Sequence, residues 1–123
     1  MMDANALARF FSRAMGDILA DRLLPEAREA LLDALQAGSV RVAERRPDGE
    51  WIVNAWAKVG ILAAFKSSEA VEFPDWPGGA VDKAALPPRA LGLADGVRMV
   101  PGGSSVRRGA FLAPGVVVMP PAY

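Results

Sequence analysis

The last quarter of the chain carries a six-residue repeat, and this repeat limits the possible folds more than any other feature of the sequence. Divided into blocks of six from residue 100, it reads VPGGSS, VRRGAF, LAPGVV and VMPPAY. The first position of each block is aliphatic: Val100, Val106, Leu112 and Val118. The fifth position is small: Ser104, Ala110, Val116 and Ala122. The third and fourth positions are Gly, Pro or Arg.

Such a repeat is typical of a parallel β-helix, in which the aliphatic residues fill the interior and the small residues fit its tight corners. Three blocks make one triangular coil, so the chain holds little more than one. A coil buries its apolar face only against stacked neighbours, and we therefore expect a continuation after Tyr123, from the same gene product or another chain. The alternative is a Gly/Pro-rich loop region in which the valines recur by chance.

The segment before the repeat lacks periodicity. Between Ser67 and Gly96, several prolines and glycines interrupt any regular element, and we predict an irregular linker over residues 67–99. Phe73 and Trp76 lie inside this segment. They are expected either to anchor the loop on an apolar surface or to recognise a substrate.

The first part of the chain has a helical pattern. Apolar residues recur at steps of three and four from Leu7 to Leu19, which predicts one amphipathic helix. A second helix is expected from Pro25, which suits a first helical turn, to Ala37, with Gly38 as a left-handed stop. The leucines of this second helix are expected to pack against the first.

A two-residue period starts at Val40 and returns after the turn signal Asp48-Gly49, which predicts a β-hairpin over Val40–Val53. Asn54 is expected to cap a third helix, from Ala55 to about Phe65. Because that helix is apolar nearly all round, we expect a neighbouring domain or subunit to cover part of it. The predicted class is α+β, with a helical domain and hairpin over residues 1–66, the linker over 67–99, and an incomplete hexapeptide β-helix over 100–123.

Composition excludes several functions. The formal net charge is zero, from 14 basic and 14 acidic side chains, so no overall field attracts nucleic acid or an anionic membrane. The chain has no histidine and no cysteine, which rules out a Ser/His/Asp triad, a thiol nucleophile and the commonest metal ligands, and we expect no metal site. No targeting segment or run of about 20 apolar residues is visible, and we expect a cytoplasmic protein.

Two stretches resemble the tetrahydrodipicolinate N-succinyltransferase family. The first is LQAGSVRVAER, followed by DGEW and NAWAK, over residues 35–58. The second is GVRMVP, VRRGAFLAP and VVMP, which resembles the start of the family's β-helix. The chain departs from the family pattern where a glycine appears within WAKVGILAAFK and where PGGSS replaces a shorter turn.

The resemblance implies a left-handed β-helix and succinyl transfer from succinyl-CoA, as co-substrate, to the amino group of tetrahydrodipicolinate in diaminopimelate and lysine synthesis. It implies no permanently bound cofactor, and a homotrimer with active sites between subunits. Arg98 is the one substrate contact that the resemblance places in this chain, on a carboxylate of the acceptor. The family's catalytic carboxylates and most of its CoA groove are expected beyond Tyr123, so no catalytic residue is assigned and the chain alone is expected to be inactive. Arg107 and Arg108 are weaker candidates, because one neighbour of a small-residue corner normally points outward into water, and no role is assigned to them.

Three hypotheses therefore stay open. The chain is the N-terminal part of an acyltransferase, or a stand-alone interaction module that completes a partner's β-helix, or an unrelated small α+β binding protein in which the six-residue blocks are accidental.

Overall fold

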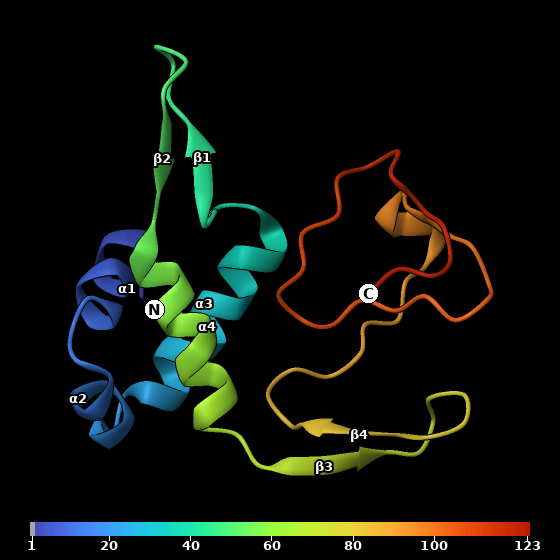
Figure 1. Ribbon diagram of the computed structural model, residues 1–123, viewed down its shortest axis with the longest axis horizontal. Coiled ribbons are helices and arrows are strands. Elements are labelled where there is room, and N and C mark those ends of the chain that lie inside the picture. Colours follow the sequence, from blue (N-terminus) through green and yellow to red (C-terminus); the bar gives the residue numbers. More distant parts are fainter. Residues whose placement is uncertain (1) are drawn as a thin grey trace.

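The computed structural model describes residues 2–123 of the protein, which has a mixed α and β architecture (Figure 1). Four helices form the N-terminal part: α1 (Ala4–Phe11), α2 (Met15–Ala20), α3 (Leu24–Ala37) and α4 (Ala55–Lys66). Three two-stranded sheets and one 3-10 turn, η1 (Leu93–Asp95), make up the regular structure of the remainder. Within residues 2–123, every helix is too short or too polar to cross a lipid bilayer.

The prediction of one helix from Leu7 to Leu19 is wrong, because two helices meet at a bend. The Ser12 hydroxyl donates a hydrogen bond to the Ala8 carbonyl at 2.6 Å, and the chain leaves the helical conformation at Ala14, where ψ is 141°. The apolar spacing nevertheless identified much of the buried face, since Leu7, Phe11 and Ile18 are fully buried. The helical spacing of apolar residues can thus continue from one helix into the next, so the spacing alone does not show where the first helix ends.

The second predicted helix is confirmed as α3. Pro25 lies in its first turn, and Gly38 follows its last residue with φ of 77°, a left-handed conformation that glycine adopts without steric cost. The Gly38 and Ser39 amides donate to carbonyls of the last turn of α3. The helix therefore ends where its capping residue predicts.

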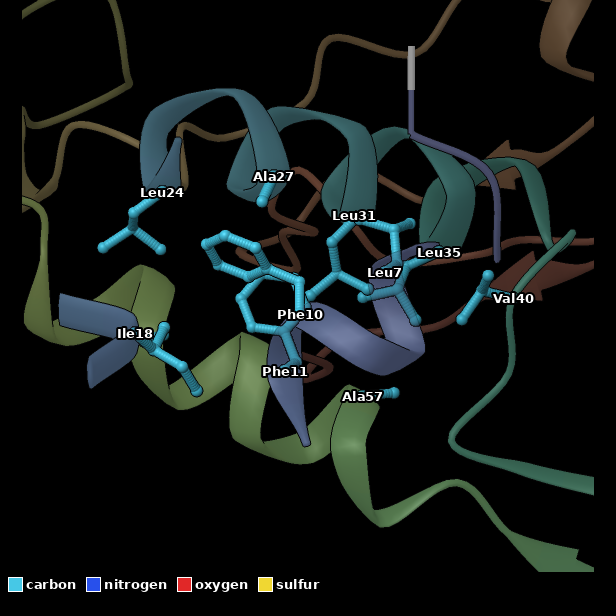
Figure 2. Packing of buried hydrophobic residues seen from close by; sticks show 11 residues of the cluster. Leu7, Phe10, Phe11, Ile18, Leu24, Ala27, Leu31, Leu35, Val40 and Ala57 are labelled. Atoms are coloured by element: carbon cyan, nitrogen blue, oxygen red, sulfur yellow. The ribbon is translucent and has the colours of Figure 1, made fainter. Parts of the chain in front are cut away.

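The main hydrophobic core lies where α1, α3 and α4 meet, with α2 closing one end (Figure 2). Phe11, Leu31 and Ala57 are fully buried there, and Phe10 packs edge-on against Phe11 with ring centroids 5.0 Å apart. Gly60 of α4 faces the same core: a Cβ atom at this position would lie 2.2 Å from Leu31 Cδ2. The absence of a side chain at residue 60 thus allows α4 to approach α3 closely.

The predicted hairpin is confirmed as strands β1 (Ala43–Arg45) and β2 (Trp51–Val53), which pair antiparallel. The expected role of Asn54 is wrong. Its side chain makes no capping bond to α4 and donates instead to the Arg41 carbonyl at 2.7 Å, across the base of the hairpin. This amide therefore joins the two ends of the hairpin, and the first turn of α4 goes without a side-chain cap.

The segment 67–99, predicted to be irregular, contains a second antiparallel hairpin. Strands β3 (Ala70–Phe73) and β4 (Ala80–Lys83) pair over four residues each. Buried Ala85 and Leu86 follow β4 and pack with Leu32 of α3 and with Phe65 of α4. Part of the apolar surface of α4 is therefore covered by this segment of the same chain, while Leu62 stays 43% exposed.

The C-terminal tail turns back on itself and brings two short strands together in parallel (orange and red in Figure 1). Strand β5 (Arg98–Met99) pairs with β6 (Val117–Val118). The Arg98 amide donates to the Val116 carbonyl at 2.9 Å, and the Val100 amide donates to the Val118 carbonyl at 3.0 Å. The sheet formed here has two strands and does not close.

Candidate functional site

Arg98, the one site residue expected from the sequence, lies on the parallel strand pair of the tail. It sits opposite Val117 in the register, and both residues are exposed. Its backbone amide is held by Val116, which fixes the main chain and leaves the side chain free. Among residues 2–123, no carboxylate lies within ion-pairing distance of its guanidinium. Arg98 can therefore offer two parallel donors to an external carboxylate.

Arg107 and Arg108, the weaker candidates to which the sequence assigned no role, form ion pairs inside the molecule. Arg108 forms ion pairs with Glu29 and with Asp33, the latter at 2.7 Å, and both partners belong to α3. Arg107 pairs with Asp82 of β4 at 3.1 Å. The two arginines thus tie the tail to a helix and to the second hairpin. Because Glu29 and Asp33 are 79 and 75 positions from Arg108, no local pattern could reveal these pairs.

The environment of Arg108 changes its ionisation. Burial by itself lowers the pKa of this guanidinium, but hydrogen bonds with Asp33 and Glu29 outweigh burial and raise the pKa. The Arg108 guanidinium is therefore held in its charged form by the two carboxylates with which it pairs.

Further contacts attach the middle of the tail to the C-terminal end of α3 and to the residues just after it. The Gly109 amide donates to the side chain of Gln36 at 3.1 Å. The Phe111 ring lies against Gly38, where a Cβ atom would come within 2.8 Å of it, and the Arg41 guanidinium lies 3.9 Å from the ring centroid. The position of the tail relative to the helices is thus set by a cluster of polar and aromatic contacts.

Two pockets are lined by charged or aromatic residues of the segments described above. One, of about 430 Å³, is polar and includes Arg28, Arg108, Glu29 and Glu69 in its lining. The other, of about 350 Å³, has Phe73 and Trp76 among its lining residues, together with prolines. Both of these aromatic side chains are half-buried, which fits either role expected for them. Arg98 lines neither pocket, and residues 2–123 contain no group of three potential metal-binding side chains.

Comparison with known proteins identifies relatives of one kind. Residues 11–66 match the family model described as "Tetrahydrodipicolinate N-succinyltransferase N-terminal". Proteins named 2,3,4,5-tetrahydropyridine-2,6-dicarboxylate N-succinyltransferase are similar over a longer range. The protein of Paramagnetospirillum magneticum is 45% identical over 102 residues, covering 77% of this chain and 35% of the relative. The protein of Nitrobacter hamburgensis is 41% identical over 104 residues, covering 77% of this chain and 37% of the relative.

The similarity extends past the helical part. Only ten residues precede residue 11, so an alignment over 77% of the chain must continue well beyond residue 66. The chain spans about a third of the length of the curated relatives that it matches. These matches, together with the helices and hairpin that the family model covers, confirm the resemblance of the chain to the N-terminal part of tetrahydrodipicolinate N-succinyltransferases.

Proposed function

We propose that this chain is the N-terminal part of an enzyme that transfers succinyl from succinyl-CoA to the amino group of tetrahydrodipicolinate, in lysine and diaminopimelate synthesis. The observation that carries this proposal is the 45% identity to a relative with this activity in its name. The reaction removes a proton from an amine and stabilises an oxyanion at the thioester carbon. The groups that do so belong, in this proposal, to the two thirds of the relatives' length that the chain does not span.

We propose further that the tail is the first coil of a left-handed β-helix. Its hydrogen bonds from Arg98 to Val116 and from Val100 to Val118 connect residues eighteen positions apart, which equals three blocks of six. All eight residues at the first and fifth positions of the blocks are buried or half-buried. Both observations support an inward-facing repeat. The chain would then divide into a helical domain (1–66), a linker containing β3 and β4 (67–99), and the coil (100–123).

Within this proposal Arg98 binds a carboxylate of the acceptor. It is an exposed guanidinium on a hydrogen-bonded strand, without an internal partner among residues 2–123. Tetrahydrodipicolinate is a dicarboxylate, and a guanidinium fork donates two hydrogen bonds to one carboxylate. The proposal includes a cytoplasmic homotrimer with succinyl-CoA as co-substrate, and no turnover by the 123 residues alone.

A chimera tests the proposal: the present chain replaces the matching N-terminal part of the Paramagnetospirillum magneticum relative. We expect the chimera to release free CoA from succinyl-CoA only when tetrahydrodipicolinate is present. Arg98→Ala should raise the KM for the acceptor at least about tenfold, as expected for a lost charged hydrogen bond, and leave the KM for succinyl-CoA unchanged. Arg98→Lys should recover part of the loss.

Arg9→Ala is the matched control, because Arg9 is exposed, lies in α1 and precedes the region matched by the family model. It should leave both KM values unchanged. A folded chimera without acceptor-dependent CoA release would overturn the proposed reaction. Equal KM values for the Arg98→Ala and Arg9→Ala variants would overturn the role of Arg98 alone.

A further inference from the structure

The 3-10 turn η1 leads the chain into β5 and has an exposed surface. Leu93, Ala94 and Asp95 of this turn are all exposed, and Leu93 is fully so. Gly96 follows the turn, and β5 with Arg98 begins two residues later. Because apolar burial contributes little to holding η1 in place, the position from which the chain enters β5 depends on polar contacts.

One carboxylate closes the turn and connects it to the segment before it. Asp95 Oδ2 accepts a hydrogen bond from the Gly92 amide at 2.7 Å. The other oxygen of the same carboxylate, Oδ1, lies 3.9 Å from Arg89 Nη2. The two oxygens of Asp95 therefore face different partners, and the ion pair joins η1 to Arg89.

Arg89 is itself anchored on the tail, through both its backbone and its side chain. Its amide donates to the Val106 carbonyl at 2.8 Å, and its Nη1 donates to the Ala110 carbonyl at 2.6 Å. The Arg108 amide donates to the Pro87 carbonyl at 2.8 Å, so the segment around Arg89 runs along the first part of the tail. The half-buried guanidinium of Arg89 thus spans the distance from this fixed segment to η1.

The far end of η1 is held by a different part of the tail. The Gly96 carbonyl accepts a hydrogen bond from the Gly115 amide at 2.8 Å, and the Arg98 amide donates to the Val116 carbonyl at 2.9 Å. Arg89 therefore holds the turn at its start, and Gly115 and Val116 hold the chain where the turn ends. Without Arg89, η1 would be attached at one end only, and the chain would enter β5 in more than one direction.

We propose that Arg89 is a positioning residue for Arg98: through its ion pair with Asp95, it fixes the turn from which the chain enters β5. This inference rests on the proposed function, in which Arg98 binds a carboxylate of the acceptor. The side chain of Arg98 is exposed, so its direction is set by the strand that carries it. A displacement of about 1 Å in a substrate-positioning group can lower a rate by about a hundredfold. Arg89 acts through η1 and β5 and does not contact the acceptor.

Steady-state kinetics of the chimera described above test this role. Arg89→Ala should raise the KM for tetrahydrodipicolinate at least about fivefold and leave the KM for succinyl-CoA unchanged, because Arg98 binds the acceptor alone. Arg89→Lys keeps the charge and should recover part of the loss. Asp95→Asn keeps an oxygen for the Gly92 amide but removes the charge that faces Arg89. It should raise the same KM by a smaller factor, about twofold, as for a partly exposed ion pair.

A double-mutant cycle separates this role from a general loss of stability. In a chimera that already carries Arg98→Ala, adding Arg89→Ala should change the KM for the acceptor by less than about twofold, because the group that Arg89 positions is absent. Arg13→Ala is the matched control. Arg13 also forms one ion pair, with Asp21, but it lies among the N-terminal helices. Its loss should leave both KM values unchanged.

Amide hydrogen exchange of the chimera, followed by mass spectrometry of its peptides, reports on the contact without any substrate. Arg89→Ala should speed up exchange in peptides that contain the Arg98 or the Gly115 amide, since both amides donate hydrogen bonds where the chain enters β5. Arg13→Ala should leave these peptides unchanged. If Arg89→Ala does not fold, Asp95→Asn provides the same comparisons, because it alters one exposed side chain.

The outcomes distinguish this inference from the proposed function. A folded chimera without acceptor-dependent CoA release overturns the proposed function and the role of Arg89 with it, and so does an unchanged acceptor KM in Arg98→Ala for the roles of both arginines. In an active chimera that depends on Arg98, the role of Arg89 alone is overturned by any of three results. These are an unchanged acceptor KM in Arg89→Ala, an equal rise of this KM with and without Arg98→Ala, and unchanged exchange at the Arg98 amide.

Discussion

The substitution Gly60→Ala tests whether α4 packs as closely as the structure shows. The new Cβ atom would lie 2.2 Å from Leu31 Cδ2 and 3.2 Å from Phe11 Cδ2, and both of these side chains are fully buried. Alanine raises helix propensity by about 1 kcal/mol, whereas overpacking of a full core costs typically about 1–3 kcal/mol. Because 2.2 Å is far below van der Waals contact, we take the upper part of that range. We expect a net loss of about 1–2 kcal/mol.

Chemical and thermal denaturation followed by circular dichroism measures this loss, which corresponds to roughly 3–10 °C in Tm for a chain of this size. The matched control is Gly16→Ala in α2, where nothing lies within 4 Å of the added Cβ atom. Gly16→Ala should raise the free energy of unfolding by about 0.5 kcal/mol or leave it unchanged. If Gly60→Ala stabilised the protein as much as Gly16→Ala, the close approach of α4 to α3 would be refuted.

Two further substitutions test single interactions. Arg108→Ala removes the ion pairs with Glu29 and Asp33 and should lower the free energy of unfolding in urea by about 1–2 kcal/mol. Amide hydrogen exchange in the tail should become faster. Unchanged exchange rates in the tail would contradict its attachment to α3. In the folded protein the pKa of Asp21 is lowered by a hydrogen bond from the Leu23 amide and by Arg13. The charged Asp21 carboxylate therefore stabilises the fold fully above the unfolded pKa of about 3.9, and this stabilisation is lost as the pH falls through the lower pKa of the folded state. Asp21→Asn should therefore show a shallower loss of urea midpoint between about pH 5 and pH 2.5 than the wild type, and parallel curves would show that Asp21 contributes nothing.

Features encoded within a few residues could be predicted from the sequence. Gly38 marks the end of α3, and Asp48-Gly49 lies in the turn of the first hairpin, because left-handed and turn conformations depend on the local residue type. The bend between α1 and α2 was missed because buried residues keep their helical spacing across it. The β3–β4 hairpin was missed because its strands are four residues long and its connection contains the prolines and glycines that indicate a loop.

The contacts that position the tail depend on residues far apart in the sequence. Arg108, Gly109 and Phe111 gain their partners from α3 and the residues just after it, and only the folded chain brings them together. The proposed site is a different case. Arg98 was identified through family resemblance, and the structure adds that it is exposed and unpaired among residues 2–123.

The parallel pairing of β5 with β6 is the feature on which the proposed first coil of a β-helix depends most, and NMR can observe this pairing directly. Scalar couplings across hydrogen bonds should connect the Arg98 amide with the Val116 carbonyl, and the Val100 amide with the Val118 carbonyl. Nuclear Overhauser contacts should follow the parallel register of Arg98 with Val117 and of Met99 with Val118. An antiparallel pattern of contacts between these residues, or a helical tail, would contradict the account.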